Sequence, residues 1–563
     1  MPACDLSMRR KAGILTAALV AAVFLWLLFT LPPRPAIAAG VVPDAIKANT
    51  IAGAFHVHSV RSDGSGSRAE IAAAAARAGL KFVIVTDHGD ATRSPDPPAY
   101  IDGVLCIDAV EISTNGGHVV AFDMPAAPYP LGGEAAAVIE DIVRLGGMPV
   151  IAHPDSPKAA LTWKDWSAPA GGLEWLNLDS AWRDEPFQRL ASIAVGSFFR
   201  PAPALAVTLA RPASLLTTWD KLASNRVVVG LAGHDAHGGL RRAEEYRGDQ
   251  RWTLPGLGSY DVAFRTFSTR VILDVPLSGD PVADARRLSQ SVRRGSLFTA
   301  IDALASPPAV DFSASLGATR HQMGGEVLLA QPLHLAFRSN LPPGAKAVLL
   351  ANGVEASSST SGDIQFDVPR VGVYRVEVRT ADADVPWIVT NPIYVRGAGR
   401  QRPIERREAS GVPVMEVEDA GVIEKDPVST ATLGGEAGTR VLKFRLRPGE
   451  HVSQYVAFAI PLSQDTPEFN QLAFTGKSSA PLRVSVQLRF EALGGARWGH
   501  SVYLSPEGRE IVVPLARLVA LDRPGQALPS RGATSLLFVV DLTNAAPGSE
   551  GEFEISSLRL ARR

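Results

Sequence analysis

The chain has 563 residues, which is long enough for more than one domain. Its content of 46% hydrophobic and 20% charged residues is typical of a globular protein with a full core. Basic and acidic residues nearly balance, 56 against 57, which argues against a broad nucleic-acid-binding surface. Cys4 and Cys106 are the only cysteines, so a disulfide framework and a CxxC metal site are both excluded.

The first 40 residues have the features of an export segment. Arg9, Arg10 and Lys11 precede 22 uncharged residues at positions 12–33. This run is longer than the usual apolar core of a signal peptide, yet "AIAA" at 36–39 offers small residues for cleavage. We therefore predict that residues 1–40 are either a signal peptide or a membrane anchor. In both cases the rest of the chain would be exported, to the periplasm or the extracellular space.

Residues 41–305 alternate between predicted strands and helices. A strand, "TIAGAFHVH", is followed by a helix, "SRAEIAAAAARAGL", in which Ser67 and Glu70 have the spacing of a capping box. Further strands include "KFVIVTDH", "MPVIAH" and "VVVGLAGHDAH". This alternation predicts a mainly parallel sheet covered by helices, and the length suits a (β/α) barrel.

After position 305 the pattern changes to short strands separated by Gly, Pro and Ser turns. Residues 306–398 predict a small immunoglobulin-like β-sandwich. Residues 399–411, within a charged and Gly/Pro-containing stretch, predict a linker. Residues 412–563 again contain only strand patterns and predict a second β-sandwich of the jelly-roll kind. We therefore expect one α/β domain followed by two all-β domains.

Nine titratable residues lie where the α/β strands end or in the loops that follow: His56, His58, Asp63, His88, Glu111, His118, His153, Asp235 and His237. In an α/β barrel the carboxyl ends of the strands meet at one face, so these side chains should converge. Burying so many such groups together is costly unless cations organise them. Imidazole and carboxylate without thiolate suit Zn²⁺, Mn²⁺ or iron. Nine ligands exceed the needs of one ion, so the set predicts two or three divalent ions.

The motifs that carry these residues are "HVHSVRSDG", "TDH", "EIS", "GHVVAF", "AHP" and "GHDAH". Together they resemble the polymerase and histidinol phosphatase (PHP) family of metal-dependent phosphoesterases. That family has a distorted (β/α)7 TIM-like barrel. The resemblance extends from Phe55 to His237 and fills all nine ligand positions. It implies a hydrolase of small phosphorylated substrates, and the "SDG" motif resembles the branch that acts on nucleotides.

The resemblance also implies how the ligands share the ions. One ion would be held by His56, His58, Glu111 and Asp235. Glu111 would bridge to a second ion on His118 and His153, and a third would be held by Asp63, His88 and His237. A metal-bridging hydroxide would be the nucleophile, with Glu111, Asp235 and His237 as the catalytic residues. No side chain stands out as the acid for the leaving group.

Other residues near these motifs allow more than one interpretation. Asp87 is either a partner of the ligands or an ordinary turn residue, and His234 is expected not to be a ligand. Arg61, Arg241 and Arg242 are candidates for holding a substrate phosphate, with solvated surface arginines as the alternative. Glu174 and Asn177 lie on a further strand that could line the cleft. The amidohydrolases also begin with an HxH strand, but they usually add a bridging lysine, which Glu111 replaces here.

The last domain loosely resembles galactose-binding-like sandwiches, including carbohydrate-binding modules. This resemblance depends on the strand layout around "WGHSVYLSPEGREIVVPL" and "LLFVVDLTN". Trp498 and Tyr503 would then either stack on a sugar or pack in the domain. A second functional hypothesis therefore remains: an envelope or carbohydrate-binding protein in which the barrel is mainly a scaffold. Its ligand would be a carbohydrate or another cell-envelope component.

Overall fold

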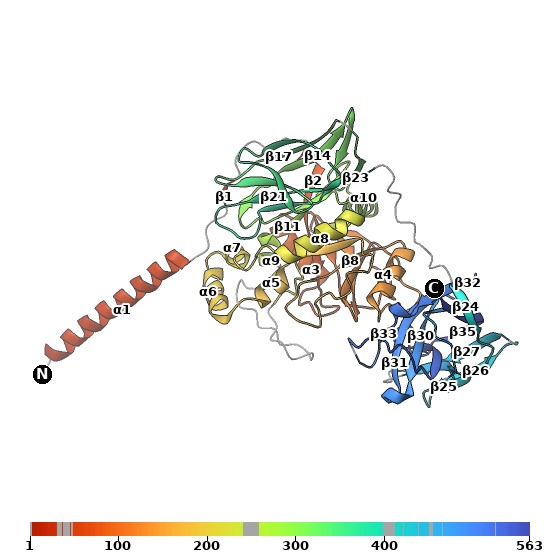
Figure 1. Cartoon of the computed structure of the whole chain (residues 1–563). Coiled ribbons are helices and arrows are strands. Elements are labelled where there is room, and N and C mark those ends of the chain that lie inside the picture. The colour runs from red at the N-terminus through yellow and green to blue at the C-terminus, as the bar shows by residue number, and fades with distance from the viewer. Residues whose placement is uncertain are drawn as a thin grey trace.

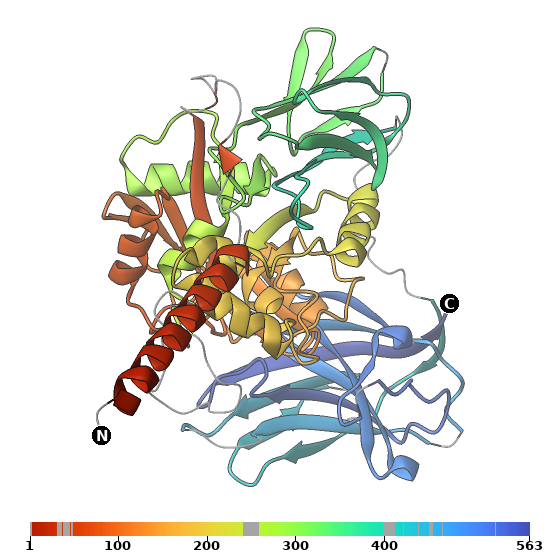
Figure 2. The same ribbon diagram turned by 90° about the vertical axis from the view of Figure 1, so that its left-hand side faces the viewer.

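The structure is a computed structural model that describes residues 3–30, 36–37, 46, 49–239, 258–330, 332–397, 411–419, 421–436, 438–449, 454–463, 465–523 and 525–563. Figure 1 shows a long N-terminal helix, a central α/β domain and two regions built of strands. The two β regions lie on opposite sides of the α/β domain (Figures 1 and 2). The protein is thus a multidomain chain with many strands, as the sequence predicts.

Helix α1 covers Ala3–Thr30 and begins the chain. The short strand β1 (Ala36–Ile37) pairs in parallel with β13 (Ala305–Ser306). Among the residues described here, no helix combines the length and the apolar character that crossing a membrane requires. Export of the chain stays a prediction from the sequence.

The α/β domain contains the following strands and helices: β2 (Thr50–Val57), α3 (Arg68–Arg77), β3 (Phe82–Val85), β4 (Ala99–Ile101), β5 (Val104–Asp108), β6 (Val110–Thr114), β7 (Gly117–Phe122), α4 (Ala135–Arg144), β8 (Met148–Ile151), β9 (Gly172–Asn177), α5 (Leu178–Arg183), α6 (Phe187–Ser197), α7 (Pro201–Ala206), α8 (Ala213–Asn225), β10 (Val229–Gly233), α9 (Tyr260–Thr266), β11 (Ser268–Ile272), α10 (Pro281–Arg293) and β12 (Leu297–Ala300). The predicted capping box of α3 is present, because Ser67 and Glu70 each bond to the other's backbone N–H.

The strands of this domain close into a ring. Strands β2, β3 and β5 are parallel neighbours, and β10, β9 and β8 are parallel neighbours in a second sheet that continues through β7 to β6. Strand β5 runs directly into β6, which joins the two sheets on one side. On the other side, His234 N–H donates to Phe55 O at 2.9 Å and His58 N–H donates to Ala236 O at 3.0 Å. Strand β7 is antiparallel to both of its neighbours, so the ring is not wholly parallel.

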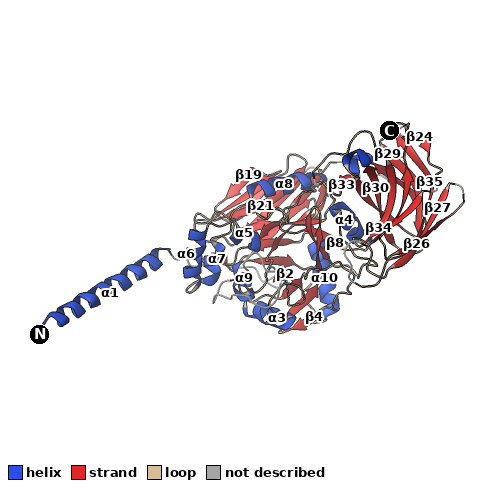
Figure 3. Ribbon diagram, turned by 90° about the horizontal axis from the view of Figure 1, so that it is seen from below, coloured by secondary structure: helices blue, strands red, loops and turns tan. Residues whose placement is uncertain are grey.

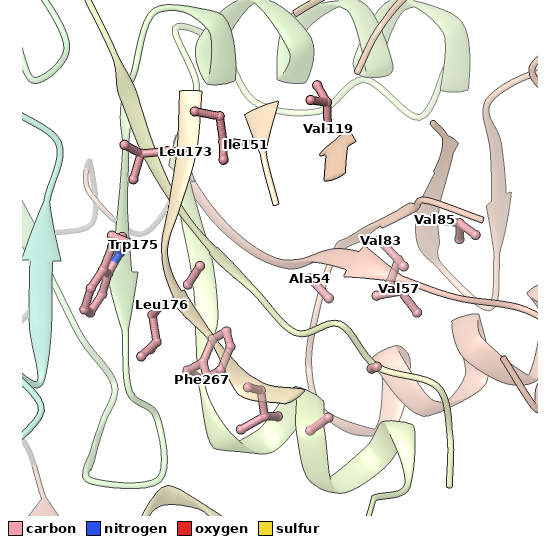
Figure 4. Packing of buried hydrophobic residues seen from close by; sticks show 14 of the residues in the cluster. Ala54, Val57, Val83, Val85, Val119, Ile151, Leu173, Trp175, Leu176 and Phe267 are labelled. Carbon is pink, nitrogen blue, oxygen red and sulfur yellow. The ribbon is translucent and has the colours of Figure 1, made fainter. Parts of the chain in front are cut away.

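Apolar residues from the strands and from the covering helices fill the domain. Figure 4 shows Val57 and Val83 of the first sheet and Leu173 and Trp175 of the second within one cluster. Phe267, which follows α9, packs in the same cluster and is fully buried. This core fixes the strands rigidly, and their carboxyl ends carry the candidate site.

The second region contains strands only: β14 (Val310–Leu316), β15 (Thr319–Gln322), β16 (Glu326–Leu328), β17 (Leu333–Ser339), β18 (Lys346–Ala351), β19 (Val354–Ser359), β20 (Asp363–Asp367), β21 (Gly372–Arg379), β22 (Ile388–Thr390) and β23 (Ile393–Arg396). Its β15-β14-β17-β20 sheet stands alone, but its other strands extend the sheet of the α/β domain through the antiparallel β12–β22 pair. The boundary predicted at 305/306 falls within the short strand β13.

The C-terminal region is a sandwich of two antiparallel sheets, built from β24 (Val412–Glu416), β25 (Val422–Lys425), β26 (Thr430–Gly434), β27 (Thr439–Arg445), β28 (Tyr455–Pro461), β29 (Gln471–Ser478), β30 (Leu482–Phe490), β31 (Ala496–Leu504), β32 (Arg509–Pro514), β33 (Val519–Ala520), β34 (Ser535–Asp541) and β35 (Glu550–Arg562). Two short 3₁₀ helices cover Glu491–Leu493 and Leu515–Arg517. Stacked Phe458 and Phe538 lie in its core. This agrees with the expected β-sandwich, while 398–410, most of the predicted linker, lies outside the described residues.

The C-terminal sandwich packs against helix α4 of the ring domain. Seen from below, α4 lies between β8 and the strands β30 and β34 (Figure 3). Arg483 of β30 is 2% exposed and donates to Asp141 of α4 at 2.6 and 2.7 Å and to Glu140 at 2.7 Å. The Arg144 guanidinium lies 3.4 Å from the ring centre of Tyr503. The two domains are thus held together by a buried ion pair.

Candidate metal centre

The structure brings the nine predicted ligands together at one end of the ring. They lie on or just after six ring strands: His56, His58 and Asp63 with β2, His88 after β3, Glu111 on β6, His118 on β7, His153 after β8, and Asp235 and His237 after β10. Residues up to 181 positions apart in the sequence thereby become neighbours, since His56 and His237 both lie within 4 Å of Asp235 Oδ1. We call these nine residues the ligand cluster.

Glu111 lies at the centre of the ligand cluster and is 1% exposed. Its Oε1 is 2.7 Å from His118 Nδ1 and 2.8 Å from His153 Nε2. Its Oε2 is 3.1 Å from His56 Nε2 and 3.3 Å from both His58 Nε2 and His88 Nδ1. One carboxylate therefore faces five imidazoles with its two oxygens directed to different sets. This is the geometry that a bridging ligand requires.

The rest of the ligand cluster surrounds His58. Its Nδ1 lies 3.3 Å from Asp63 Oδ1, and its Nε2 lies 3.3 Å from Asp235 Oδ1. His237 stacks on His58 with ring centres 4.4 Å apart, and His237 Nε2 lies 3.1 Å from Asp63 Oδ2. His88 is 3.7 Å from Asp63 Oδ1. The predicted third set, Asp63, His88 and His237, is thus assembled around one carboxylate.

Three of the ligands have a backbone conformation that residues other than glycine rarely adopt. The φ angles of His56, His153 and Asp235 are 65°, 30° and 47°. At His56 the pairing of β2 with β3 skips one residue, so Phe55 and Val57 pair with successive residues of β3. Such strained positions are common where a side chain must be aimed at a site. Here the irregular backbone directs the side chains of all three residues to the same centre.

Four overlapping triples have ligand atoms within 4.8 Å of one another: His56–Glu111–His153, His56–His58–Asp235, His58–Asp63–His88 and His88–Glu111–His118. The first two contain the residues predicted for the first ion, together with His153. The others place His88 between Asp63 and Glu111, so it can serve either of two neighbouring positions. His237 belongs to no such triple, although it contacts Asp63. The predicted grouping is therefore compatible with the geometry, but not unique.

The charges in the ligand cluster favour a cation. Burial would lower the pKa of His58, but the carboxylates of Asp235 and Glu111 raise it to about 10. Burial would also lower the pKa of His56, yet Glu174, Glu111 and Asp235 hold it well above its usual value. For Glu111 and Asp235, burial would raise the pKa, while the surrounding histidines hold it well below its usual range. A metal ion would replace the protons that these histidines otherwise retain.

The hydrogen-bonding capacity of the ligand cluster is also incompletely used. Neither ring nitrogen of His58, nor Nδ1 of His153, has a hydrogen-bond partner among the described residues. Buried polar atoms are seldom left in this state. The nitrogens of His58 instead face carboxylate oxygens at 3.3 Å, which is too far for a strong hydrogen bond and leaves room for an ion between them. The residues present fit divalent metal ions.

Two carboxylates outside the predicted set hold the ligands in place. Asp87 accepts hydrogen bonds from Ser59 N–H at 2.8 Å, Ser59 Oγ at 2.6 Å and Ser62 Oγ at 2.6 Å, so it fixes the loop that carries Asp63. Glu174 contacts His56 and the backbone of His153. The sequence left the role of Asp87 open and gave Glu174 only a place near the cleft. The sequence signal for Glu174 was an acidic residue within the predicted strand "GLEWLN".

His234 is not part of the ligand cluster. Its ring nitrogens lie 3.3 Å from Phe55 O and 3.0 Å from Phe267 O, and the ring stacks on Phe267 with centres 4.2 Å apart. Burial lowers the pKa of His234 to about 4. The buried side chain is therefore neutral, and its single N–H can donate to only one of these two carbonyls.

Only one of the three arginines proposed for substrate binding, Arg61, lies among the described residues. Arg61 donates to Asp96 at 2.7 Å and lies 3.5 Å from Asp108. Arg61 is therefore paired with two carboxylates outside the ligand cluster, and its role in substrate binding stays a prediction. Arg241 and Arg242 lie outside the described residues.

The two aromatic residues considered for sugar stacking both pack against other side chains. Trp498 is 1% exposed, packs edge-on against Phe490 and lies in the sandwich core. Tyr503 lies beneath the Arg144 guanidinium of the ring domain. Packing, and not a free stacking surface, therefore explains both side chains.

Comparisons with known proteins place only the C-terminal architecture in context. No family model matches the chain, and no curated protein matches it. Among solved structures, the family 11 carbohydrate-binding module of a cellulosomal cellulase from Clostridium thermocellum is 15% identical, with a TM-score of 0.22. The match covers 28% of this chain and 97% of the module.

Two further solved structures give a similar result. The same module in complex with a β-1,3-1,4-mixed-linked tetrasaccharide is 16% identical, covers 28% of this chain and 98% of its own, and has a TM-score of 0.22. A variant of a family 29 carbohydrate-binding module is 15% identical, with 27% and 92% covered and a TM-score of 0.18. With scores this low, the likeness assigns no ligand to this chain. The sandwich architecture is established by the two sheets themselves.

Proposed function

We propose that the protein is an exported, metal-dependent hydrolase of phosphate esters, of the PHP type. The observation that carries this proposal is the position of Glu111, a buried carboxylate whose two oxygens face five imidazoles within a cluster of nine titratable side chains. The closed order β2, β3, β5/β6, β7, β8, β9, β10 supports the distorted (β/α)7 barrel that the resemblance implies. Zn²⁺, Mn²⁺ and iron are the ions that suit these ligands.

Divalent ions bound side by side in such a site make water nucleophilic at neutral pH and neutralise the charge that develops on a phosphate ester. The chain's own residues determine where this can happen. Glu111 and Asp235 supply negative charge at the buried side, and His56 and His58 are fully buried. These four residues would hold the ions without meeting the substrate.

The open side of the ligand cluster is formed by the predicted third set. The side chains of Asp63, His88 and His237 are 26%, 35% and 17% exposed, whereas His56 and His58 are 0% exposed. A phosphorylated substrate would therefore approach past these three residues. His237 Nδ1 lies 2.8 Å from Asp235 O, which turns Nε2 toward Asp63 and the opening. This placement directs His237 Nε2 toward the side from which an ester would approach, which fits the catalytic role proposed for it.

The alternative function is that of an envelope or carbohydrate-binding protein with the ring domain as a scaffold. The loose sequence resemblance of the last domain suggested it, and the likeness to solved carbohydrate-binding modules, at TM-scores of 0.22 or less, adds no argument. A scaffold has no need for three strained, buried ligand residues directed at one centre. A sugar-binding surface on Trp498 or Tyr503 is blocked by packing. The metal-dependent function is therefore the better supported of the two.

A combined experiment separates the two functions. The full chain is purified and its metal content is measured by mass spectrometry. Hydrolysis of a panel of phosphomonoesters and phosphodiesters, nucleotides included, is then measured with Mn²⁺ and Zn²⁺, while binding of soluble β-glucans is measured by calorimetry. We expect about two or three ions per chain and turnover of a phosphate ester that stops in chelator. Absence of tightly bound metal together with β-glucan binding would reverse the choice.

Export is tested separately. We infer it from the basic residues Arg9–Lys11 and the uncharged run at 12–33. A reporter active only outside the cytoplasm, fused after Arg563, should be active. N-terminal sequencing should then find either a start near Ala39, which indicates cleavage, or an intact start in the membrane fraction, which indicates an anchor. A silent reporter on a soluble protein would refute export and leave the metal-site proposal in place.

A further inference from the structure

We infer that Glu174 is a positioning residue that couples the two ion sites joined by Glu111, acting through His56 on one side and His153 on the other. This inference deepens the proposed function and rests on it. Glu174 is not among the predicted ligands, and none of its described hydrogen bonds reaches an exposed residue.

Glu174 lies on β9 in the interior of the ring and is 0% exposed. Its Oε1 is 2.6 Å from His56 Nδ1. Its Oε2 accepts hydrogen bonds from the backbone N–H of His153 at 2.7 Å and from Asn177 Nδ2 at 2.9 Å. Each oxygen therefore serves a different ligand: one contacts a ligand's ring, and the other holds the backbone that places a ligand's ring.

The contact with His56 fixes which ring nitrogen carries the proton. An ionised carboxylate only accepts hydrogen bonds, so His56 Nδ1 must donate to Glu174. The lone pair of a neutral His56 then lies on Nε2, which faces Glu111 and Asp235. This is the nitrogen that a metal ion needs, and a carboxylate partner also makes it a better donor.

The contact with His153 fixes a strained backbone. His153 has a φ angle of 30°, and such a conformation persists only when surrounding contacts enforce it. The hydrogen bond from its N–H to Glu174 is one of those contacts. It keeps His153 Nε2 within 2.8 Å of Glu111 Oε1. Glu174 thus connects, from outside the ligand cluster, the same two ion sites that Glu111 connects directly.

The chain also provides the space that Glu174 occupies. A Cβ atom added to Gly233 would lie 2.0 Å from Glu174 Oε1 and 2.3 Å from its carboxyl carbon. Gly233 ends β10 and precedes Asp235 by two residues. Only glycine leaves the carboxylate where it meets His56. This close approach explains the glycine in "GLAGHDAH" and gives an independent way to displace Glu174.

Charge is a further reason to regard Glu174 as part of the metal centre. Among the described residues its one ion-pair partner is His56. Together with Glu111, Asp235 and Asp63 it brings four carboxylates to one region, and an uncompensated buried charge is costly. Bound cations would compensate this charge. Buried charges in proteins are paired or coordinate metal ions.

The test compares Glu174→Gln with Asp284→Asn in the full chain. Glutamine can still accept from His56 through its carbonyl, but its NH₂ group cannot accept from the His153 N–H. Asp284 is equally buried, on α10, and accepts from the backbone N–H groups of Ser278 and Gly279, away from the ligand cluster. It therefore controls for the loss of a buried carboxylate. Mn²⁺ affinity and stoichiometry are measured by calorimetry, and the Tm of the metal-free protein by circular dichroism.

We expect Glu174→Gln to weaken Mn²⁺ binding roughly 10–100-fold, and Gly233→Ala to weaken it in the same direction. Asp284→Asn should lower the Tm and leave Mn²⁺ affinity unchanged. Turnover of Glu174→Gln at saturating Mn²⁺ should show a lower kcat with little change in KM, because the residue does not touch the substrate. Lowered Tm with Mn²⁺ affinity unchanged would overturn the inference and reduce Glu174 to a structural residue.

These outcomes are distinct from failure of the proposed function. A wild-type chain that binds Mn²⁺ but hydrolyses no phosphate ester would refute the hydrolase, while the loss of affinity in Glu174→Gln would still uphold the coupling. A wild-type chain that hydrolyses esters with Glu174→Gln unaffected would refute the coupling alone. A wild-type chain that binds neither Mn²⁺ nor Zn²⁺ would refute both.

Discussion

Two buried clusters of charged residues in this protein differ in how their charges are satisfied. The ligand cluster combines imidazoles with carboxylates and leaves three imidazole nitrogens without a hydrogen bond to any residue that the structure describes. The second cluster joins the ring domain to the second β region around Arg375, which is 1% exposed. Arg375 forms a bidentate ion pair with Asp220 at 2.9 and 3.0 Å and donates to Glu377 at 2.7 Å. Arg211 donates twice to Glu377, at 2.9 and 2.7 Å.

This difference distinguishes a structural cluster from a chemical one. In the Arg375 cluster, fixed cations meet carboxylates in fork-like geometry, so nothing further is needed to balance the charge. In the ligand cluster, the positive charge would have to come from protons on histidines or from bound ions. Burial alone is common to both clusters and therefore identifies neither. In the ligand cluster, incomplete hydrogen bonding and strained backbone occur together.

The largest expected effect is that of Glu111→Gln. Glutamine has nearly the same shape but removes the charge that faces five imidazoles. Metal content measured by mass spectrometry should fall for two ions together. Phosphoesterase activity should fall by more than the roughly 10–100-fold expected for an outer partner. Full metal content in the variant would show that Glu111 does not bridge, and Asp284→Asn is the matched control.

Arg375→Met tests the opposite behaviour in the structural cluster. Removing the arginine leaves the Asp220 carboxylate buried without its ion-pair partner, whereas Glu377 keeps Arg211, and the loss costs about 3–5 kcal/mol of stability. Urea denaturation followed by fluorescence should show the loss. Metal content and activity of the folded variant should stay at the wild-type level. A fall in metal content without a loss of stability would mean that the two clusters are not separate.

Much of the ligand cluster could be predicted because its information is local. Each predicted ligand lies on or soon after a recognisable strand, and parallel strands bring their ends to one face. Glu174 was harder to interpret, because its role depends on contacts with His56 and the backbone of His153, 118 and 21 positions away. The shared β12–β22 sheet across the predicted boundary was missed for the same reason. Strand patterns reveal strands but not their partners.

The C-terminal sandwich shows the same limit at the scale of domains. Its strands and its start near Val412 follow from alternating sequence patterns. Its contact with α4 depends on Arg483 meeting Asp141, which is 342 positions away. No local pattern encodes that pair. A charged residue on a strand reads as solvated, whereas here it is buried between domains.

Arg483→Met tests whether this contact holds the domains together. Arginines and charged residues at 396–408 make the predicted linker the expected site of trypsin cleavage. Cleavage should release a C-terminal piece of roughly 155–165 residues, by length from the linker to the terminus. In the wild type, the two pieces should remain associated in gel filtration through Arg483, Asp141 and Glu140. In the variant they should separate. Cleavage mainly within 60–240 would instead refute the proposed boundaries.

The smallest expected effect is a dependence of stability on pH in the Arg375 cluster, and it appears only in acid. Burial would raise the pKa of Glu377, but Arg211 and Arg375 lower it from 4.5 to about 2. The unfolded chain therefore binds the proton more readily than the folded chain between these two values. The stabilisation is fully present above pH 4.5 and is lost as the pH falls toward 2. Its full size is about 3 kcal/mol, since each pKa unit corresponds to about 1.4 kcal/mol.

The measurement is the free energy of unfolding of wild type minus that of Glu377→Gln, from urea denaturation at several pH values. Groups that titrate alike in both proteins cancel in this difference. It should be constant from pH 7 to 5 and should shrink as the pH falls below 4.5. A difference that stayed constant down to pH 3 would show that the arginines do not hold Glu377 ionised, and the contrast between the two buried clusters would lose its electrostatic basis.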